Sequence, residues 1–92
     1  MINFNHLRIL YHAAKHQNFS LAAKALFITQ PAVSTQVKRL EEQCNLNFFK
    51  KKGRKVYLTD EGKALYQYAK KIFEYEHDIE NAIEEMCELK RG

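Results

Sequence analysis

Residues 20–40 read SLAAKALFITQPAVSTQVKRL, and this stretch decides the fold. Two short helical patterns meet within it at a four-residue turn, residues 27–30. We expect Ser20 to cap the first helix and Ile28 to be buried in the turn. The second pattern begins near Pro31. Its apolar side chains recur at helical spacing and form one stripe that we expect to be buried: Val33, Val37, Leu40 and Cys44.

The opposite face of the second pattern carries no long apolar side chain. Small hydroxyls and amides on such a face can approach base edges in the major groove of DNA, and cations can meet phosphates. Pro31 suits the first helical position, where its missing N–H would be unpaired anyway, and Thr29 or Gln30 should cap the helix. We therefore expect residues 31–44 to form a helix with this outward set: Pro31, Ser34, Thr35, Lys38 and Arg39.

The chain then changes from a helical to a strand-like pattern. Residues 48–51 and 56–59 read as two short strands, joined by a four-residue turn in which Gly53 can take a positive φ. Five of the six residues 50–55 are cations, a density that attracts phosphates. We expect this hairpin to form a wing whose tip residue, Arg54, enters a minor groove. A solvated basic run, or one resembling a nuclear-localisation signal, is the alternative.

The last third of the chain predicts one long helix. Thr59 is a good N-cap, and Asp60 and Glu61 lie where the helix dipole favours negative charge. A helix over residues 60–89 would be about 45 Å long at about 1.5 Å per residue, more than the head of the molecule can cover. We expect the chain's own first helix to cover the inner half, and a second copy of the long helix to cover the outer half. The a and d positions of four heptads form the expected dimerisation stripe: Leu65, Tyr68, Ile72, Tyr75, Ile79, Ala82, Met86 and Leu89.

Charge divides the chain into two parts. Residues 1–59 hold ten Lys and Arg against two acids, whereas residues 60–92 hold five against nine. This asymmetry indicates a head that faces nucleic acid and a differently employed tail. The alternative is a charge pattern that only confers solubility.

Several function classes find no support. Cys44 and Cys87 lie far apart without a CxxC pair, so neither a disulfide framework nor a zinc site is expected. A first helix is expected from residue 4 to residue 15 or 16, capped by Asn3. His12 and His16 lie on it without a third ligand, so we expect no metal. Neither a phosphate-cradling glycine loop nor a nucleophile paired with a base is found, so we expect no enzyme and no cofactor. Without a membrane span or signal peptide, the expected location is the cytoplasm, near the nucleoid.

Residues 20–41 read S-x-A-A-x-x-L-x-I-T-Q-P-A-V-S-x-Q-V-K-x-L-E, followed by Phe48 and Phe49 and by G-R-x-V-x-L-T-x-x-G over residues 53–62. This pattern resembles the N-terminal DNA-binding domain of LysR-type transcriptional regulators, and the resemblance covers nearly the whole chain. It implies a mainly α fold: a winged helix-turn-helix with a small β-hairpin wing and a long C-terminal linker helix. The linker helix would pair with its twofold mate.

The resemblance also implies sequence-specific binding to an inverted-repeat operator by a homodimer, with a tetramer possible in the full-length protein. Helix 31–44 would lie in the major groove and wing 50–55 in the minor groove. The side chains expected to contact double-stranded DNA are Ser20, Thr29, Gln30, Pro31, Ala32, Ser34, Thr35, Lys38, Arg39, Lys51, Lys52, Arg54 and Lys55.

The chain departs from the family's pattern in three places. Thr35 stands where many relatives carry Arg or another long polar residue, which leaves the base preference there open. Asn45 replaces the usual Gly after the helix, and we expect it to adopt a left-handed conformation. Lys50 and Lys51 replace a common Glu-Arg pair, which makes this wing more basic.

We expect a DNA-binding head at residues 1–59, a linker and dimerisation helix at residues 60–89, and the start of a linker to an effector-binding domain at residues 90–92. That domain, which would bind a small-molecule inducer, is not part of this sequence, so we expect a fragment of a longer regulator rather than a natural stand-alone module. Two other functions stay open: a protein-interaction module built on the coiled-coil helix, and a nonspecific architectural DNA binder.

Overall fold

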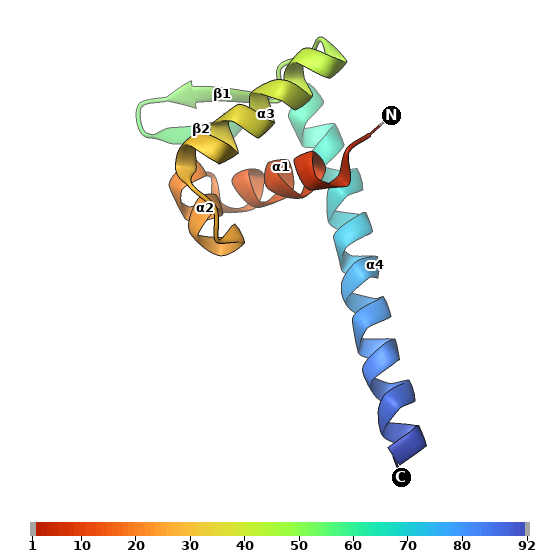
Figure 1. Ribbon diagram of the computed structural model, residues 1–92. Coiled ribbons are helices and arrows are strands. Elements are labelled where there is room, and N and C mark those ends of the chain that lie inside the picture. Colours follow the sequence, from red (N-terminus) through yellow and green to blue (C-terminus); the bar gives the residue numbers. More distant parts are fainter. Residues whose placement is uncertain (1, 92) are drawn as a thin grey trace.

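The computed structural model describes residues 2–91, and Gly92, the last residue of the expected linker, lies outside them. Three helices and a hairpin form a head from which one long helix projects, and the molecule measures 53 × 25 × 19 Å (Figure 1). The elements in chain order are α1 (Phe4–His16), α2 (Phe19–Leu26), α3 (Gln30–Cys44), β1 (Phe49–Lys52), β2 (Lys55–Leu58) and α4 (Asp60–Arg91). The prediction of a mainly α, winged helix-turn-helix fold with a long C-terminal helix is confirmed.

The core of the head lies where α1, α2 and α3 meet. Leu10 of α1 and Val33 of α3 are its largest fully buried side chains. Val33 belongs to a cluster that α2 and β2 complete, whereas Leu10 packs in a second cluster with Leu40 and Phe48. Because burial of apolar surface is the main stabilising term in folding, these two clusters fix α3 against the rest of the head.

Side-chain caps set the helix starts, and the cap of α2 differs from expectation. Asn18, not Ser20, caps α2: its Oδ1 accepts a hydrogen bond from Leu21 N at 2.9 Å, so the helix begins one residue before Ser20. Asparagine competes well with serine for this position, which explains the difference. Thr29 caps α3 by accepting from Ala32 N, so Pro31 occupies the second helical position rather than the first.

All three head helices end on a residue in the left-handed conformation. Asn45 does so at φ 55°, as predicted, and Gln17 and Phe27 do so at φ 51° and 58°. The backbone N–H of Phe27 bonds to carbonyls of α2 while its ring projects into solvent, 95% exposed. Ile28 is also exposed, against expectation, because its N–H bonds back to Ala23 O and the tight turn directs the side chain outward.

One further burial prediction is wrong for a simple geometric reason. Val33, Val37 and Leu40 are buried as expected, but Cys44 is exposed. Cys44 lies in the last turn of α3, beyond the region that the other head elements cover. Phe4, in the first turn of α1, is exposed for the same reason.

The wing is an antiparallel pair in the register Phe49↔Leu58, Lys50↔Tyr57, Lys51↔Val56 and Lys52↔Lys55. Its turn has two residues rather than the expected four, and the glycine in it has φ +65°. The tighter turn extends the ladder to the base of the tip and holds the two strands in a fixed register.

The junction between the wing and α4 is closely packed. Thr59 caps α4 as predicted, accepting a hydrogen bond from Gly62 N at 3.1 Å, and its own N–H bonds to Phe48 O at 3.0 Å. A Cβ on Gly62 would lie 2.1 Å from that same Phe48 oxygen. Only glycine therefore lets the wing backbone approach the first turn of α4 this closely.

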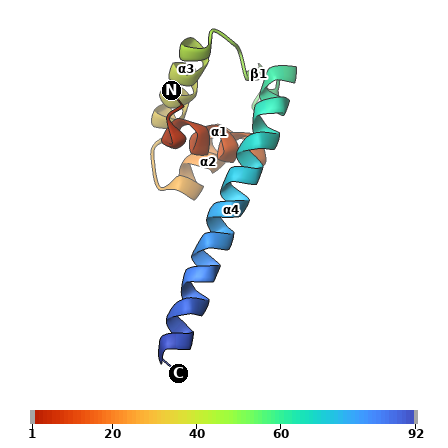
Figure 2. The same ribbon diagram turned by 90° about the vertical axis from the view of Figure 1, so that its right-hand side faces the viewer.

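Figure 2 shows α4 passing α1 and then continuing beyond the head to the C-terminus. The helix extends through Lys90 and Arg91, two residues past its expected end. No helix among residues 2–91 is long and apolar enough to cross a membrane.

Candidate nucleic-acid interface

The outward face of α3 is open to solvent. Thr29, Gln30, Pro31, Thr35, Lys38 and Arg39 are exposed, and Ala32 and Ser34 are half-buried beside them. These side chains lie opposite the buried stripe of Val33, Val37 and Leu40, as the helical period predicts. The face is accessible to a partner as large as a duplex, and contact with DNA stays a prediction.

One hydrogen bond organises the beginning of this face. Gln30 Nε2 donates to Ser34 Oγ at 2.9 Å, one helical turn further along. This bond holds the amide while leaving its oxygen and its second N–H free. An acceptor and a donor side by side match the N6 and N7 edge of adenine in the major groove. The hydroxyl oxygen of Thr29 already accepts a hydrogen bond from Ala32 N, which caps α3.

A hollow of about 330 Å³ connects α3 to the wing. It brings together residues that are distant in the sequence, among them five of the expected DNA contacts: Ser20, Gln30, Lys51, Arg54 and Lys55. Lys51 Nζ lies 5.5 Å from the ring centroid of Phe19, which orients this cation toward the hollow. Asn18 also lines it and was not anticipated from the sequence.

The wing lysines do not share one face. Side chains alternate along a strand, so Lys51 faces the 330 Å³ hollow while Lys50 and Lys52 point the other way. Lys50 and Lys52 line a second hollow of about 460 Å³, together with Tyr57 and Lys63 of α4. Lys52 therefore lies on the opposite face of the wing from Lys51. Lys63 of α4, which was not expected to lie near the wing, joins Lys50 and Lys52 in the 460 Å³ hollow.

No carboxylate neutralises the wing. Neither hollow is lined by an acidic residue, and the sole ion pair within residues 2–91 joins Arg8 to Glu76, far from the hairpin. Unpaired cations at this density create a positive potential that attracts polyanions and depends strongly on salt.

The expected dimerisation stripe lies on the outside of α4. Tyr68 is 67% exposed and Leu89 80% exposed, and Ile72, Tyr75, Ile79 and Met86 are exposed between them. Ala82 is half-buried, and Leu65 packs against the head instead. The expectation that α1 covers the inner half of this stripe holds only for Leu65, which packs against the cluster that includes Leu10 of α1. The aromatic contacts of α1 fall on a different face of α4, the face of Tyr66 and Phe73.

The histidines of α1 do not form a metal site with other side chains. The rings of His12 and His16 stack at 6.0 Å. Within the described part of the chain, no three His, Cys, Asp or Glu side chains come together in a way that could hold a metal ion.

Comparison with known proteins gives one consistent result. The model of the bacterial regulatory helix-turn-helix protein, lysR family, matches residues 4–63. The HTH-type transcriptional regulator CitR of Bacillus subtilis (strain 168) is 36% identical over 91 residues, which is 99% of this chain and 30% of that regulator. The RuBisCO operon transcriptional regulator of Allochromatium vinosum is 32% identical over the same length, again 99% of this chain and 30% of that protein.

A solved structure agrees with these relatives. The crystal structure of the BenM_DBD/benA site 1 DNA complex contains a chain with 30% identity and a TM-score of 0.81, covering 94% of this chain and 97% of that one. This chain thus spans about a third of the curated regulators and nearly all of the BenM_DBD chain. The family model covers well over half of the residues, and we conclude that the chain belongs to the lysR family of bacterial regulatory helix-turn-helix proteins.

Proposed function

We propose that this chain binds double-stranded DNA sequence-specifically, as a homodimer on an inverted repeat, and regulates transcription within a longer protein. One observation carries the proposal: the open polar face of α3 continues, through the hollow beside Gln30, onto a wing whose cations have no acidic partner. The similar BenM_DBD chain was crystallised in a complex with DNA, which supports the same partner here.

The two parts of this surface have different tasks. Gln30 and Ser34, with Thr35, would read base edges in the major groove, because amides and hydroxyls can pair with them specifically. Lys38, Arg39 and the wing lysines that line the 330 Å³ hollow would hold phosphates and fix the register. Arg54, at the tip of the wing, would enter the neighbouring minor groove, where narrow A·T-rich stretches concentrate negative potential.

The exposed stripe of α4 supports the dimer. Tyr68, Tyr75 and the aliphatic residues between and beyond them form an apolar seam along the projecting helix.

The rest of the longer protein would add the regulatory function. The curated relatives are about three times as long as this chain, and we propose that a further domain of the longer protein binds a small-molecule inducer. The protein would act on operator DNA in the cytoplasm, at the nucleoid, with possible assembly into a tetramer.

The test uses fragments of the host genome selected by binding to the chain, and compares a selected duplex with a random one. Gln30→Ala is expected to weaken binding to the selected duplex by about 1–3 kcal/mol, because a bidentate base contact is lost. Binding to the random duplex should change little. Arg54→Ala should reduce the slope of log K against log[salt] by about 0.9, one counterion. The substitution Glu88→Gln on the far end of α4 is the matched control and should change neither quantity.

Other outcomes separate the alternatives. Equal binding to selected and random duplexes would contradict sequence-specific reading and indicate an architectural DNA binder. No binding to any duplex at low salt would leave the protein-interaction module built on α4. Either result would refute the proposal.

A further inference from the structure

The long helix α4 uses two separate faces. Tyr66, Ala69, Phe73 and Glu76 lie toward the head: Tyr66 and Phe73 contact Tyr11, Ala69 is fully buried, and Glu76 binds Arg8. At about 100° per residue, this face lies about 110° around the helix from the exposed stripe that we assign to the dimer. The orientation of one face on the head therefore determines the direction in which the other face points.

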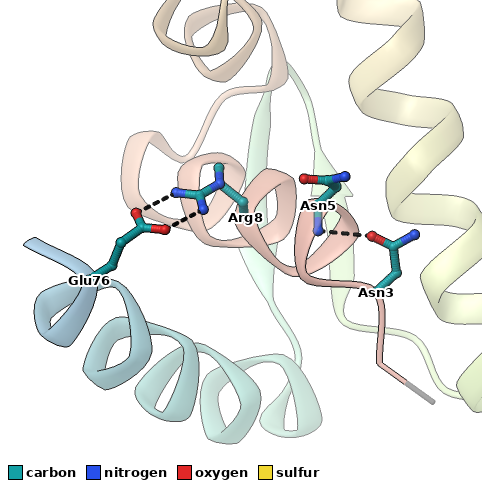
Figure 3. Close-up of polar contacts among 4 residues, drawn as sticks. All are labelled: Asn3, Asn5, Arg8 and Glu76. Atoms are coloured by element: carbon teal, nitrogen blue, oxygen red, sulfur yellow. Dashed lines mark hydrogen bonds and ion pairs between the residues drawn. The ribbon is translucent and has the colours of Figure 1, made fainter. Parts of the chain in front are cut away.

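Arg8 and Glu76 fasten α4 to α1 through a contact that we call the clasp. Arg8 donates from Nη1 to Glu76 Oε1 at 2.8 Å and from Nη2 to Oε2 at 2.6 Å (Figure 3). The same guanidinium lies over the Phe73 ring, with Cζ 4.6 Å from the centroid. Two parallel hydrogen bonds and the contact with the ring constrain both distance and angle, which a single lysine ammonium could not do.

The other contacts of this joint constrain the angle less. Tyr11 stacks on Tyr66 at 5.5 Å and contacts Phe73 at 5.3 Å. Aromatic pairs prefer certain arrangements, but these contacts are less directional than a pair of charge-assisted hydrogen bonds. The clasp adds a directional contact to this joint, at the point where α4 leaves the head.

The clasp also lies where it controls the projecting part of the helix. Beyond Glu76, every described residue of α4 except Ala82 is exposed. Glu76 is thus the outermost residue of α4 with a hydrogen bond or ion pair to the head within residues 2–91. The part of α4 that follows it extends away from the head (Figure 2).

We propose that Arg8 and Glu76 are positioning residues that determine which spacing between two half-sites the dimer accepts. The inference rests on the proposed function, since spacing has meaning only for a dimer on two half-sites. A tilt of the head at the clasp moves α3 relative to the dimer stripe, and the rise of one base pair, about 3.4 Å, sets how small a movement changes the accepted spacing.

The clasp is suited to this task because it contributes little to holding the head together. Its two side chains are 35% and 43% exposed, and exposed ion pairs add little to stability. The hydrogen bond to Arg8 lowers the pKa of the Glu76 carboxyl, so the pair stays charged at neutral pH. The core of the head is formed by other residues, so variants of the clasp should fold.

The test measures spacing preference separately from half-site recognition. Duplexes carry the selected half-site once, or twice as an inverted repeat with spacers that differ by one base pair. The wild-type chain should prefer one spacer by at least tenfold over spacers two base pairs longer or shorter. In Arg8→Ala and Glu76→Gln, this ratio should fall to threefold or less, while affinity for the single half-site stays within twofold. Melting curves confirm that each variant is folded.

Three matched variants sharpen the result. Glu80→Gln removes an acid one turn beyond the clasp, which makes no hydrogen bond to Arg8, and should keep the wild-type ratio. The exchange Arg8→Glu with Glu76→Arg restores an ion pair and should recover at least part of the preference. Arg8→Lys, which keeps the charge but loses the two-pronged geometry, should behave more like Arg8→Ala.

Failure of the inference and failure of the proposed function give different results. Unchanged spacer ratios in both single variants would overturn the role of the clasp while leaving the DNA-binding dimer intact. A wild-type chain that shows no spacer preference would also overturn it. A wild-type chain that binds two half-sites no more tightly than one would refute the dimer itself.

Discussion

Replacing Gly62 by alanine should destabilise the protein, although the same exchange within a helix is usually stabilising. Replacing an interior helical glycine by alanine usually stabilises a helix by about 1 kcal/mol. Here the added Cβ would lie 2.1 Å from Phe48 O and 2.9 Å from Leu58 Cδ2. The first of these atoms belongs to the backbone, and it also accepts the hydrogen bond from Thr59 N at 3.0 Å. The wing and α4 must therefore move apart.

The size of the effect follows from these contacts. Overpacking costs about 1–3 kcal/mol, and weakening the buried hydrogen bond costs about a further 1 kcal/mol. After the gain in helix propensity, we expect Gly62→Ala to lower the free energy of unfolding by about 2 kcal/mol. For a domain of this size, that corresponds to a decrease in Tm of about 8–16 °C.

Thermal unfolding followed by circular dichroism measures this, at one fixed protein concentration because a dimer's Tm depends on concentration. The control is Ala64→Gly, at an exposed position two residues further on, which should cost about 1 kcal/mol through propensity alone. Gly62→Ala that melts at or above the wild-type temperature would refute the close approach of α4 to the wing.

Three further predictions concern the wing, a histidine and the core. Lys51→Gln should lower the slope of log K against log[salt], measured on a half-site duplex, by about 0.9. Lys50→Gln, on the opposite face of the wing, should leave that slope unchanged. Equal slopes for the two variants would contradict the assignment of these lysines to opposite faces. Burial, and then the neighbouring His16, lower the pKa of His12 below 6.5, so folding favours its neutral form. The stability that results is complete above pH 6.5 and is lost as the pH falls through the lowered pKa. In His12→Gln, the urea midpoint should therefore change less between pH 7.5 and pH 5 than it does in the wild type. Leu10→Ala, at a fully buried position, should cost about 2–5 kcal/mol in urea unfolding, and a loss below 1 kcal/mol would contradict its place in the core.

The buried side of α3 could be predicted because helical periodicity is a local property. Val33, Val37 and Leu40 share one face, and that face packs against the head. Periodicity does not say where the covering elements end, so it wrongly extended the buried stripe to Cys44. The missed cap at Asn18 has a related cause, since Asn18 and Ser20 are both good caps and only the backbone decides between them.

The exposure of the candidate residues on α3 could be predicted from the sequence, but the surface that they form with the wing could not. Strand alternation could have separated Lys51 from Lys50 and Lys52, since successive side chains point to opposite faces. The cation density of the hairpin obscured this signal. Lys63 could not be assigned to the wing surface, because its placement depends on how α4 leaves the hairpin.

The heptads of α4 obscured a second pattern on the same helix. One apolar face packs against the head and recurs every three or four residues, at Tyr66, Ala69 and Phe73. The stripe of Tyr68 and Ile72 faces outward. A helix with two apolar faces does not reveal which face meets which neighbour. The ion pair of Arg8 with a residue 68 positions away could be found only in three dimensions.

The distribution of charge along the molecule has a consequence for the kinetics of association. The basic wing lies at one end of a body 53 Å long, and the acids of α4 from Glu74 to Glu88 extend toward the other. The protein therefore carries a large electric dipole along its long axis. In the field of a polyanion this dipole experiences a torque, so a tumbling molecule arrives head first and collisions by the tail are repelled. Productive encounters are enriched before any contact forms, most strongly when few ions screen the field.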